Sequence, residues 1–268
     1  ELKTFVKRFS ANASKAKQAT SRANQINKIQ LDDIAKSSRV YPFIRFNQKK
    51  KIYSNVLEVK DLVKNYDSLE VLQKISFIVD VGDRIAILGA NGIGKTTLLN
   101  CLFDENIKNS GLIKWSSNAD IAYFEQNIEN NFEGDLTLMK WMGQWIKKDD
   151  DEQRVRSILG RLLFSKDDIN KTTNVLSGGE KRRMMFGKII LQEPNIIIMD
   201  EPTNHLDMES IEALNSALDT YDGTIIFSSH DREFISSLAT RALELKPGKI
   251  LDHSANFIEN LDKIKIDK

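Results

Sequence analysis

The chain has 268 residues, of which 41% are hydrophobic and 29% are charged, and its formal net charge at pH 7 is +1. This length and apolar content suffice for one large folded domain with an extension. No apolar run reaches the roughly 20 residues of a membrane-spanning helix and no signal-peptide pattern is present, so membrane-embedded classes are excluded and we expect a soluble, cytoplasmic protein.

The charge is distributed unevenly along the chain. Residues 1–51 hold 13 Lys or Arg against 3 Asp or Glu, whereas residues 52–268 hold 26 against 35. This contrast indicates a boundary between a basic N-terminal part and a main domain, which we place at residues 55–268. Residues 36–54 would connect the two parts, because Tyr41-Pro42-Phe43 breaks a helix and leads into extended chain.

Residues 1–35 contain neither Gly nor Pro and are predicted to form a basic amphipathic helix. Arg8, Lys15 and Arg22 recur at seven-residue spacing and therefore share one face of this helix. Such a stripe is usually a solvated face, and it can also meet acidic lipids. The other face has little bulk beyond two phenylalanines, so nucleic-acid phosphates are the better partner for these three cations.

From residue 55 onward, apolar β-rich runs alternate with helical patterns, which predicts an α/β fold with helices flanking a mixed sheet. Strands are predicted near 55–60, 71–79, 84–88, 111–115, 121–126, 196–200, 224–229 and 241–246. Helices are predicted near 95–103, 137–146, 152–164, 178–191, 208–220 and 232–239. The sheet core is interrupted by a helical subdomain at about 130–180, whose Trp141 and Trp145 are expected to pack.

The sequence GANGIGKTT at 89–97 fits the phosphate-loop template G-x-x-x-x-G-K-[ST] and lies between a predicted strand and a predicted helix. Its glycines let backbone N–H groups turn toward phosphate oxygens, and the helix adds its positive end. Lys95 would reach the terminal phosphates, and Thr96 would offer its hydroxyl to Mg²⁺. Cys101 is the single cysteine, so a disulfide framework is excluded. It falls on the apolar side of this helix, which predicts a core residue. The candidate nucleotide-binding residues are Gly89, Asn91, Gly92, Ile93, Gly94, Lys95, Thr96 and Thr97.

The run IIIMDE at 196–201 predicts a buried parallel strand that delivers two carboxylates at its C-terminal end. Open α/β sheets place their ligands at this end. Asp200 is therefore the candidate Mg²⁺ partner, directly or through water, and Glu201 is the candidate general base on the attacking water. The two acids could instead cap the next helix, and that alternative stays open.

The sequence LSGGE at 176–180 completes an ordered trio with GANGIGKTT and IIIMDEPTNHLD. Together the three strings resemble the nucleotide-binding domain of the ABC ATPase superfamily, and the form EPTNHLD resembles its ABC-F branch. The resemblance covers the whole chain and implies the P-loop ABC fold, with an antiparallel β part beside the helical subdomain. It identifies Ser177, Gly178, Gly179 and Glu180 as the signature, whose open helix end would hold the γ-phosphate of a nucleotide bound by a facing domain. Many relatives have Gln in place of Glu180, and we expect little consequence.

The same resemblance assigns catalytic and metal roles. Gln126 resembles the glutamine that senses Mg²⁺ and the attacking water, and His230 resembles the switch histidine that contacts the γ-phosphate. Alone, either residue would more often be structural, so both assignments depend on the motifs around them. The candidate catalytic set is Glu201, His230 and Gln126, and the candidate metal set is Thr96, Gln126 and Asp200.

Two further positions match the family pattern. Tyr66, 23 residues before Gly89, resembles the aromatic residue that stacks on adenine, although an ordinary strand-end tyrosine would look the same. Asp207 resembles the loop aspartate that links the two ATP sites across the dimer.

The basic segment resembles the end of the linker that joins the two ATPase domains of ABC-F proteins and reaches toward tRNA and ribosomal RNA. The string SSRVYPFIRF at 37–46 is similar to the YbiT-like bacterial group, which is associated with translation. ABC-F proteins carry two phosphate loops and two signatures, whereas this chain has one of each. We therefore expect a fragment, whose complementary ABC domain is a missing N-terminal half or a second copy of the chain.

The implied activity is Mg²⁺-dependent ATP hydrolysis, with ATP and Mg²⁺ as cofactors and weak activity in the isolated chain. Domain closure driven by ATP would favour ribosome and tRNA binding. One alternative is the ATPase subunit of a membrane transporter, which would not account for residues 1–35. A second alternative is a non-catalytic scaffold that binds DNA junctions. The intact Lys95, Asp200, Glu201 and His230 argue against an inactive site.

Overall fold

A computed structural model of the chain describes residues 41–146 and 151–254. The predicted helix 1–35, with Arg8, Lys15 and Arg22, lies outside the described residues. Within the two described ranges, no helix is both long and apolar enough to cross a membrane.

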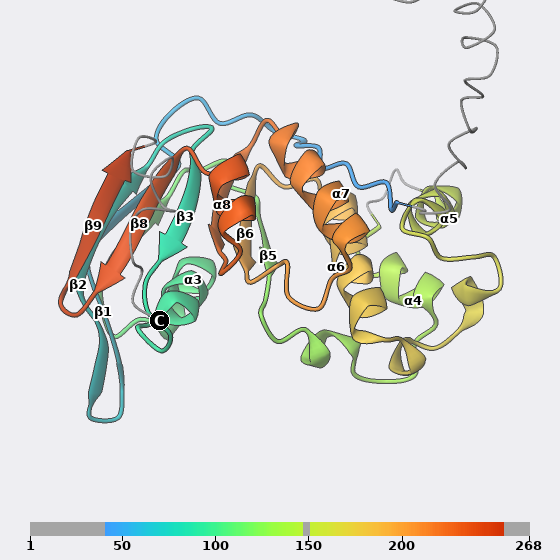
Figure 1. Ribbon diagram of the computed structural model, residues 1–268, viewed down its shortest axis with the longest axis horizontal. Coiled ribbons are helices and arrows are strands. Elements are labelled where there is room, and N and C mark those ends of the chain that lie inside the picture. Colours follow the sequence, from blue (N-terminus) through green and yellow to red (C-terminus); the bar gives the residue numbers. More distant parts are fainter. Residues whose placement is uncertain (1–40, 147–150, 255–268) are drawn as a thin grey trace, which may run out of the picture. The chain divides into compact units, whose positions relative to one another are not determined.

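A six-stranded sheet forms the centre of the domain (Figure 1), with the strand order β5-β6-β7-β3-β8-β9. Its strands are β3 (Arg84–Leu88), β5 (Ile121–Phe124), β6 (Ile196–Asp200), β7 (Thr224–Ser228), β8 (Arg241–Lys246) and β9 (Lys249–Ser254). The first five strands in this order are parallel, and β9 returns antiparallel to β8. Every residue of β6 and β7 is buried, as expected for parallel strands that are covered on both faces.

A three-stranded antiparallel sheet, in the order β2-β1-β4, covers one face of the central sheet. Its strands are β1 (Leu57–Tyr66), β2 (Leu69–Val79) and β4 (Ser110–Trp115). The pairing of β4 with β1 is irregular between Lys60 and Val63, and the close approach there requires Gly111, since this residue has φ +96° and a Cβ would lie 2.4 Å from the carbonyl oxygen of Asp61.

Helices supply the remaining layers. They are α3 (Lys95–Phe103), α4 (Leu138–Gly143), α5 (Glu152–Arg161), α6 (Gly178–Gln192), α7 (Met208–Asp219) and α8 (Arg232–Leu238), with the 3-10 turns η1 (Glu105–Ile107), η2 (Glu129–Phe132), η3 (Asp168–Asn170) and η4 (Thr173–Val175). Helices α4 and α5 lie at the end of the domain away from β1 and β2 (Figure 1).

Alternate residues of the central strands face two different cores. Ile197 and Met199 of β6 belong to the core shared with α4 to α8, whereas Ile196 and Ile198 belong to the core shared with α3 and the antiparallel sheet. Cys101 is fully buried in the second core, as predicted, and this burial raises the pKa of its thiol to about 11.

The predicted fold class is confirmed, but three details differ. Strand β9 was not predicted; it follows a two-residue turn at Pro247 and Gly248, in which Gly248 has φ +72°. Strand β1 extends to Tyr66 rather than residue 60, because irregularities in its register with β2 interrupt the polar–apolar alternation. The segment 41–54 packs on the domain, with Ile44 and Phe46 buried in its larger core.

Candidate nucleotide-binding site

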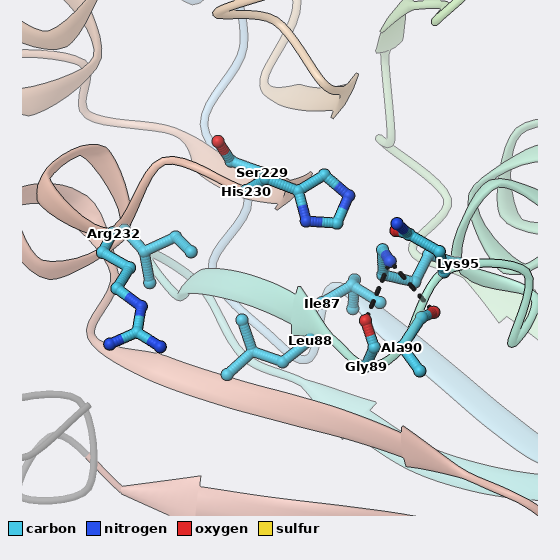
Figure 2. Close-up of a pocket in the computed structure, with 10 residues that line it drawn as sticks. Ile87, Leu88, Gly89, Ala90, Lys95, Ser229, His230 and Arg232 are labelled. Carbon is cyan, nitrogen blue, oxygen red and sulfur yellow. Dashed lines mark hydrogen bonds between the residues drawn. The ribbon is translucent and has the colours of Figure 1, made fainter. Parts of the chain in front are cut away.

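The loop between β3 and α3 curls around the amino group of Lys95. The Nζ atom donates hydrogen bonds to the carbonyl oxygens of Gly89 at 2.9 Å and Ala90 at 3.3 Å, as Figure 2 shows. Gly94 has φ +111°, and a Cβ there would lie 2.6 Å from Cγ1 of Val71 on β2. Helix α3 starts at Lys95 without a side-chain cap and without an acid in its first turn. Its N-terminal end therefore presents no negative charge of its own to an arriving anion.

Two carboxylates lie at the C-terminal end of β6, where Asp200 is the last residue of the strand and Glu201 follows it. The hydroxyl of Ser228 donates to Oδ1 of Asp200, while Oδ2 of Asp200 is buried and has no hydrogen-bond partner among the described residues. Oε2 of Glu201 accepts a hydrogen bond from the backbone N–H of His230 at 3.2 Å. The ring Nε2 of His230 lies 3.3 Å from Oε1 of Glu201. Oε1 of Glu201 is likewise buried without a hydrogen-bond partner among the described residues, so the site contains two such acceptor atoms, one on each carboxylate, beside a half-exposed imidazole.

Burial dominates the electrostatics of this site. It raises the pKa of Glu201, and the nearby negative charge of Asp200 acts in the same direction. His230 and Lys95 oppose this shift through their positive charge or hydrogen bonding. Burial also lowers the pKa of Lys95, which the two carboxylates partly offset. A carboxyl group with a raised pKa is a better proton acceptor than an exposed glutamate.

One cavity of about 520 Å³ brings most of the predicted site residues together. The hydroxyl of Thr96 lies 3.4 Å from Oε1 of Gln126 at this cavity. Its lining residues are Asn91, Gly92, Gly94, Lys95, Thr96, Thr97, Gln126, Asp200, Glu201 and His230. A second cavity, shown in Figure 2, shares Asn91, Lys95 and His230 with the first. Gly89 lines this second cavity and not the first.

The signature residues lie outside both of these cavities. Ser177 caps α6 in a capping box, in which its Oγ accepts from the backbone N–H of Glu180 and a carboxylate oxygen of Glu180 accepts from the N–H of Ser177 at 2.8 Å. Gly178 and Gly179 form the first turn of the same helix. The helix end is therefore partly occupied by its own side chains, rather than fully open as the sequence suggested.

Tyr66 and Asp207 are also outside both cavities. Tyr66 is 47% exposed at the end of β1, and the ammonium of Lys64 lies 4.6 Å from its ring centre. Asp207 caps α7 and accepts a hydrogen bond from the N–H of Ser210 at 2.7 Å, which lowers the pKa of its carboxyl. Ile93 packs at the edge of the smaller core.

Two buried residues at the site were missed by sequence reasoning. Ser228 ends β7 and orients Asp200, and Arg182 of α6 donates to the carbonyl oxygen of Glu201 at 3.4 Å. The position of Ser228 directly after the apolar run IIF was a weak signal for its role. No local pattern marks the second, because its partner is 19 residues away.

The raised pKa of Glu201 predicts a gain in stability when this residue is replaced by Gln. Below the ordinary carboxyl pKa, Glu201 is protonated in both the folded and unfolded states and has little effect. As the pH rises from the ordinary carboxyl pKa toward the raised folded-state pKa, the unfolded state loses its proton while the folded state keeps it, so stability falls relative to the variant and levels off above the folded-state value. Removing a poorly solvated charge should contribute about 1 kcal/mol, which corresponds to a gain of roughly 2–4 °C in Tm at pH 7.5.

Calorimetry of the nucleotide-free protein in EDTA, from pH 4 to pH 8, measures this difference. The gain in Tm should shrink toward zero near pH 4. The exposed Glu133 offers the matched control, and Glu133→Gln should leave Tm unchanged at every pH. A gain for Glu201→Gln that persists at pH 4 would show that ionisation is not its cause.

Comparisons with known proteins agree with this geometry. A family model described as ABC transporter matches residues 72–204, and a second with the same description matches residues 1–46. The "Probable ATP-binding protein YbiT" of Escherichia coli O157:H7 is 58% identical over 97% of this chain and 49% of its own length. "ABC transporter F family member 2" of Arabidopsis thaliana is 32% identical over 97% of this chain and 39% of its own length. The chain thus spans about half or less of these curated relatives.

A solved structure shares the fold. It is the dimeric structure of a post-hydrolysis state of an ATP-binding cassette bound to ADP and Pi, with a TM-score of 0.62 and 19% identity. The match covers 74% of this chain and 98% of that one.

Proposed function

We propose that this chain, whose residues 72–204 match the ABC transporter family model and whose relatives include a named ABC-F member, is an ABC ATPase that hydrolyses Mg²⁺-ATP jointly with a second ABC domain. The observation that carries the proposal is the convergence in one cavity of the phosphate loop with Gln126, Asp200, Glu201 and His230. These residues come from four separate parts of the sequence, and each is the type that phosphoryl transfer requires.

The donor atoms at the cavity fit Mg²⁺. This ion prefers oxygen ligands and keeps several waters, so one or two side chains and substrate phosphates suffice. Thr96, Gln126 and the partnerless Oδ2 of Asp200 would hold it, directly or through water. Bound Mg²⁺ would neutralise charge on the phosphates.

The chain's own residues would perform the remaining steps. The loop N–H groups and Lys95 bind the phosphates, and Lys95 is already oriented by two loop carbonyls. Glu201 takes a proton from the water that attacks the γ-phosphate, and ADP leaves with the bridging oxygen. His230 holds Glu201 through its backbone and contacts the γ-phosphate through its ring. Tyr66 would stack on adenine.

The signature residues of this chain would serve the nucleotide of the facing domain. Ser177 and Gly178 are exposed and lie outside the cavity at the phosphate loop, so a facing domain would reach them, while the carboxylate of Glu180 already accepts from the N–H of Ser177. Asp207, which caps the next long helix, would link the two sites. The partner is a complementary ABC domain or a second copy of this chain, and the isolated chain should therefore hydrolyse ATP slowly.

In the whole protein, we place the activity in the cytoplasm and in translation. ATP-driven closure would favour ribosome binding, and the basic segment 1–35 would meet tRNA. This part of the proposal depends on the ABC-F relatives and on the excess of 13 Lys or Arg over 3 Asp or Glu in residues 1–51.

Ribosome association of the Glu201→Gln variant tests this coupling. The whole protein carrying this change should hold ATP without turnover, and ATP should increase its co-sedimentation with ribosomes by about tenfold or more. ADP should give no increase, and neither should ATP with the Lys95→Met variant. Equal co-sedimentation with and without ATP would rule out the coupling. Selective binding to DNA junctions instead of tRNA would favour the scaffold alternative.

A further inference from the structure

Arg182 is a buried cation that the mechanism above does not use. It lies on α6, two residues after the signature, and only 5% of its surface is exposed. Its guanidinium carbon lies 5.6 Å from the ring centre of Phe124, at the end of β5, and that ring is stacked on Phe186 of the same helix. Burial lowers the pKa of the guanidinium, while the charge of Glu201 opposes the shift. The packing therefore fixes the direction of this side chain.

The guanidinium is directed at the backbone of the candidate base. Nη1 of Arg182 donates to the carbonyl oxygen of Glu201 at 3.4 Å, and this contact is buried. Glu201 itself has φ +49°, in the left-handed region that is strained for a non-glycine residue. Its N–H donates to the carbonyl and hydroxyl oxygens of Ser228, both at 3.2 Å. The strained backbone of Glu201 is thus held on both sides, by β7 and by α6.

We propose that Arg182 is a positioning residue, which holds Glu201 in the left-handed conformation that directs its carboxylate into the nucleotide cavity. The inference rests on the proposed role of Glu201 as the general base. Arg182 does not line the cavity, so its effect on the reaction is transmitted through Glu201.

The same contact connects the signature helix to this domain's own site. Ser177 caps α6, and the N–H of Lys181 donates to the carbonyl oxygen of Ser177 at 2.9 Å, so Arg182 follows directly on the first turn. A partner's nucleotide that engages this helix end would act on the element that restrains Glu201. Each ATP site would then influence the alignment of the base in the other.

Arg182→Met tests the proposal in the whole protein, because methionine fills the space without a charge or a donor. We expect kcat to fall by about tenfold or more, with KM and ATP affinity within about twofold of wild type, since a misplacement near 1 Å can cost about 100-fold in rate. Arg182→Lys keeps the charge and a donor and should recover part of kcat. Arg183→Met is the matched control, because Arg183 packs over Phe164 instead.

A double variant separates positioning from a general structural role. In single-turnover assays with radiolabelled ATP, adding Arg182→Met to Glu201→Gln should cause no further loss, because the base it positions is already absent. An equal further loss would overturn the proposal, as would an unchanged kcat for Arg182→Met or parallel losses in kcat and ATP affinity. If Arg182→Met does not fold, Arg182→Lys in both backgrounds gives the same comparison. Full activity of Glu201→Gln would instead refute the role of the base.

Discussion

Replacing Glu201 by Gln is expected to reduce ATP hydrolysis by about 100-fold or more while ATP still binds. The amide keeps the size of the side chain and can still meet the backbone N–H of His230, but it cannot accept a proton from water. Because burial raises the pKa of Glu201, the carboxylate is a stronger proton acceptor than an exposed glutamate, and its loss should be correspondingly large. Phosphate release by the whole protein, measured beside equilibrium binding of ATP, reports both quantities.

Glu133→Gln supplies the control, since this exposed residue lies outside the nucleotide cavity. Its hydrolysis rate should equal that of wild type. A Glu201→Gln rate within threefold of wild type would mean that another group accepts the proton. A parallel loss of ATP binding would instead assign Glu201 to nucleotide binding.

Replacing Lys95 by Met should weaken ATP binding by about 100-fold. Lys95 is 9% exposed and its ammonium is held by the carbonyl oxygens of Gly89 and Ala90, so its direction is set before ATP arrives. Hydrogen bonds to charged groups contribute about 1.5–3 kcal/mol each, and the phosphates would lose at least one such bond together with its positive charge. Fluorescence titration with an ATP analogue measures the change in Kd.

Lys140→Met is the control for this experiment, because Lys140 is exposed on α4 and far from the phosphate loop in sequence. Its Kd should stay at the wild-type value. Melting curves of both variants without nucleotide verify that each one folds. An unchanged Kd for a folded Lys95→Met protein would contradict the proposed phosphate site.

Local patterns in the sequence determined the central elements well. Strands β3 and β6 and helix α3 have the predicted bounds, because each is an uninterrupted apolar or helical run that ends at a motif. Strand β9 was missed because its only apolar residues are the adjacent pair Ile250 and Leu251, and its pairing with β8 depends on the turn before it. Likewise Leu163, predicted inside a helix, has φ +68° and lies beyond the end of α5.

The candidate site could be predicted only as far as its residues belong to motifs. Residues of the phosphate loop line one cavity together with Gln126, Asp200, Glu201 and His230, since the carboxyl ends of parallel strands meet at one edge of the sheet. Arg182 and Ser228 were missed because their roles arise from packing between distant segments. Tyr66 and the signature lie outside this cavity. The proposed role of Tyr66 requires a bound adenine, and that of the signature requires the nucleotide of a facing domain.

The capping box of α6 changes what the binding of a phosphate at the signature involves. In the described state, the carboxylate of Glu180 accepts hydrogen bonds from both the backbone N–H and the hydroxyl of Ser177. An arriving γ-phosphate that uses the same two donors must displace this carboxylate. Recognition at this helix end is then an exchange of anions, in which a glutamate has to leave before the partner's nucleotide can be held.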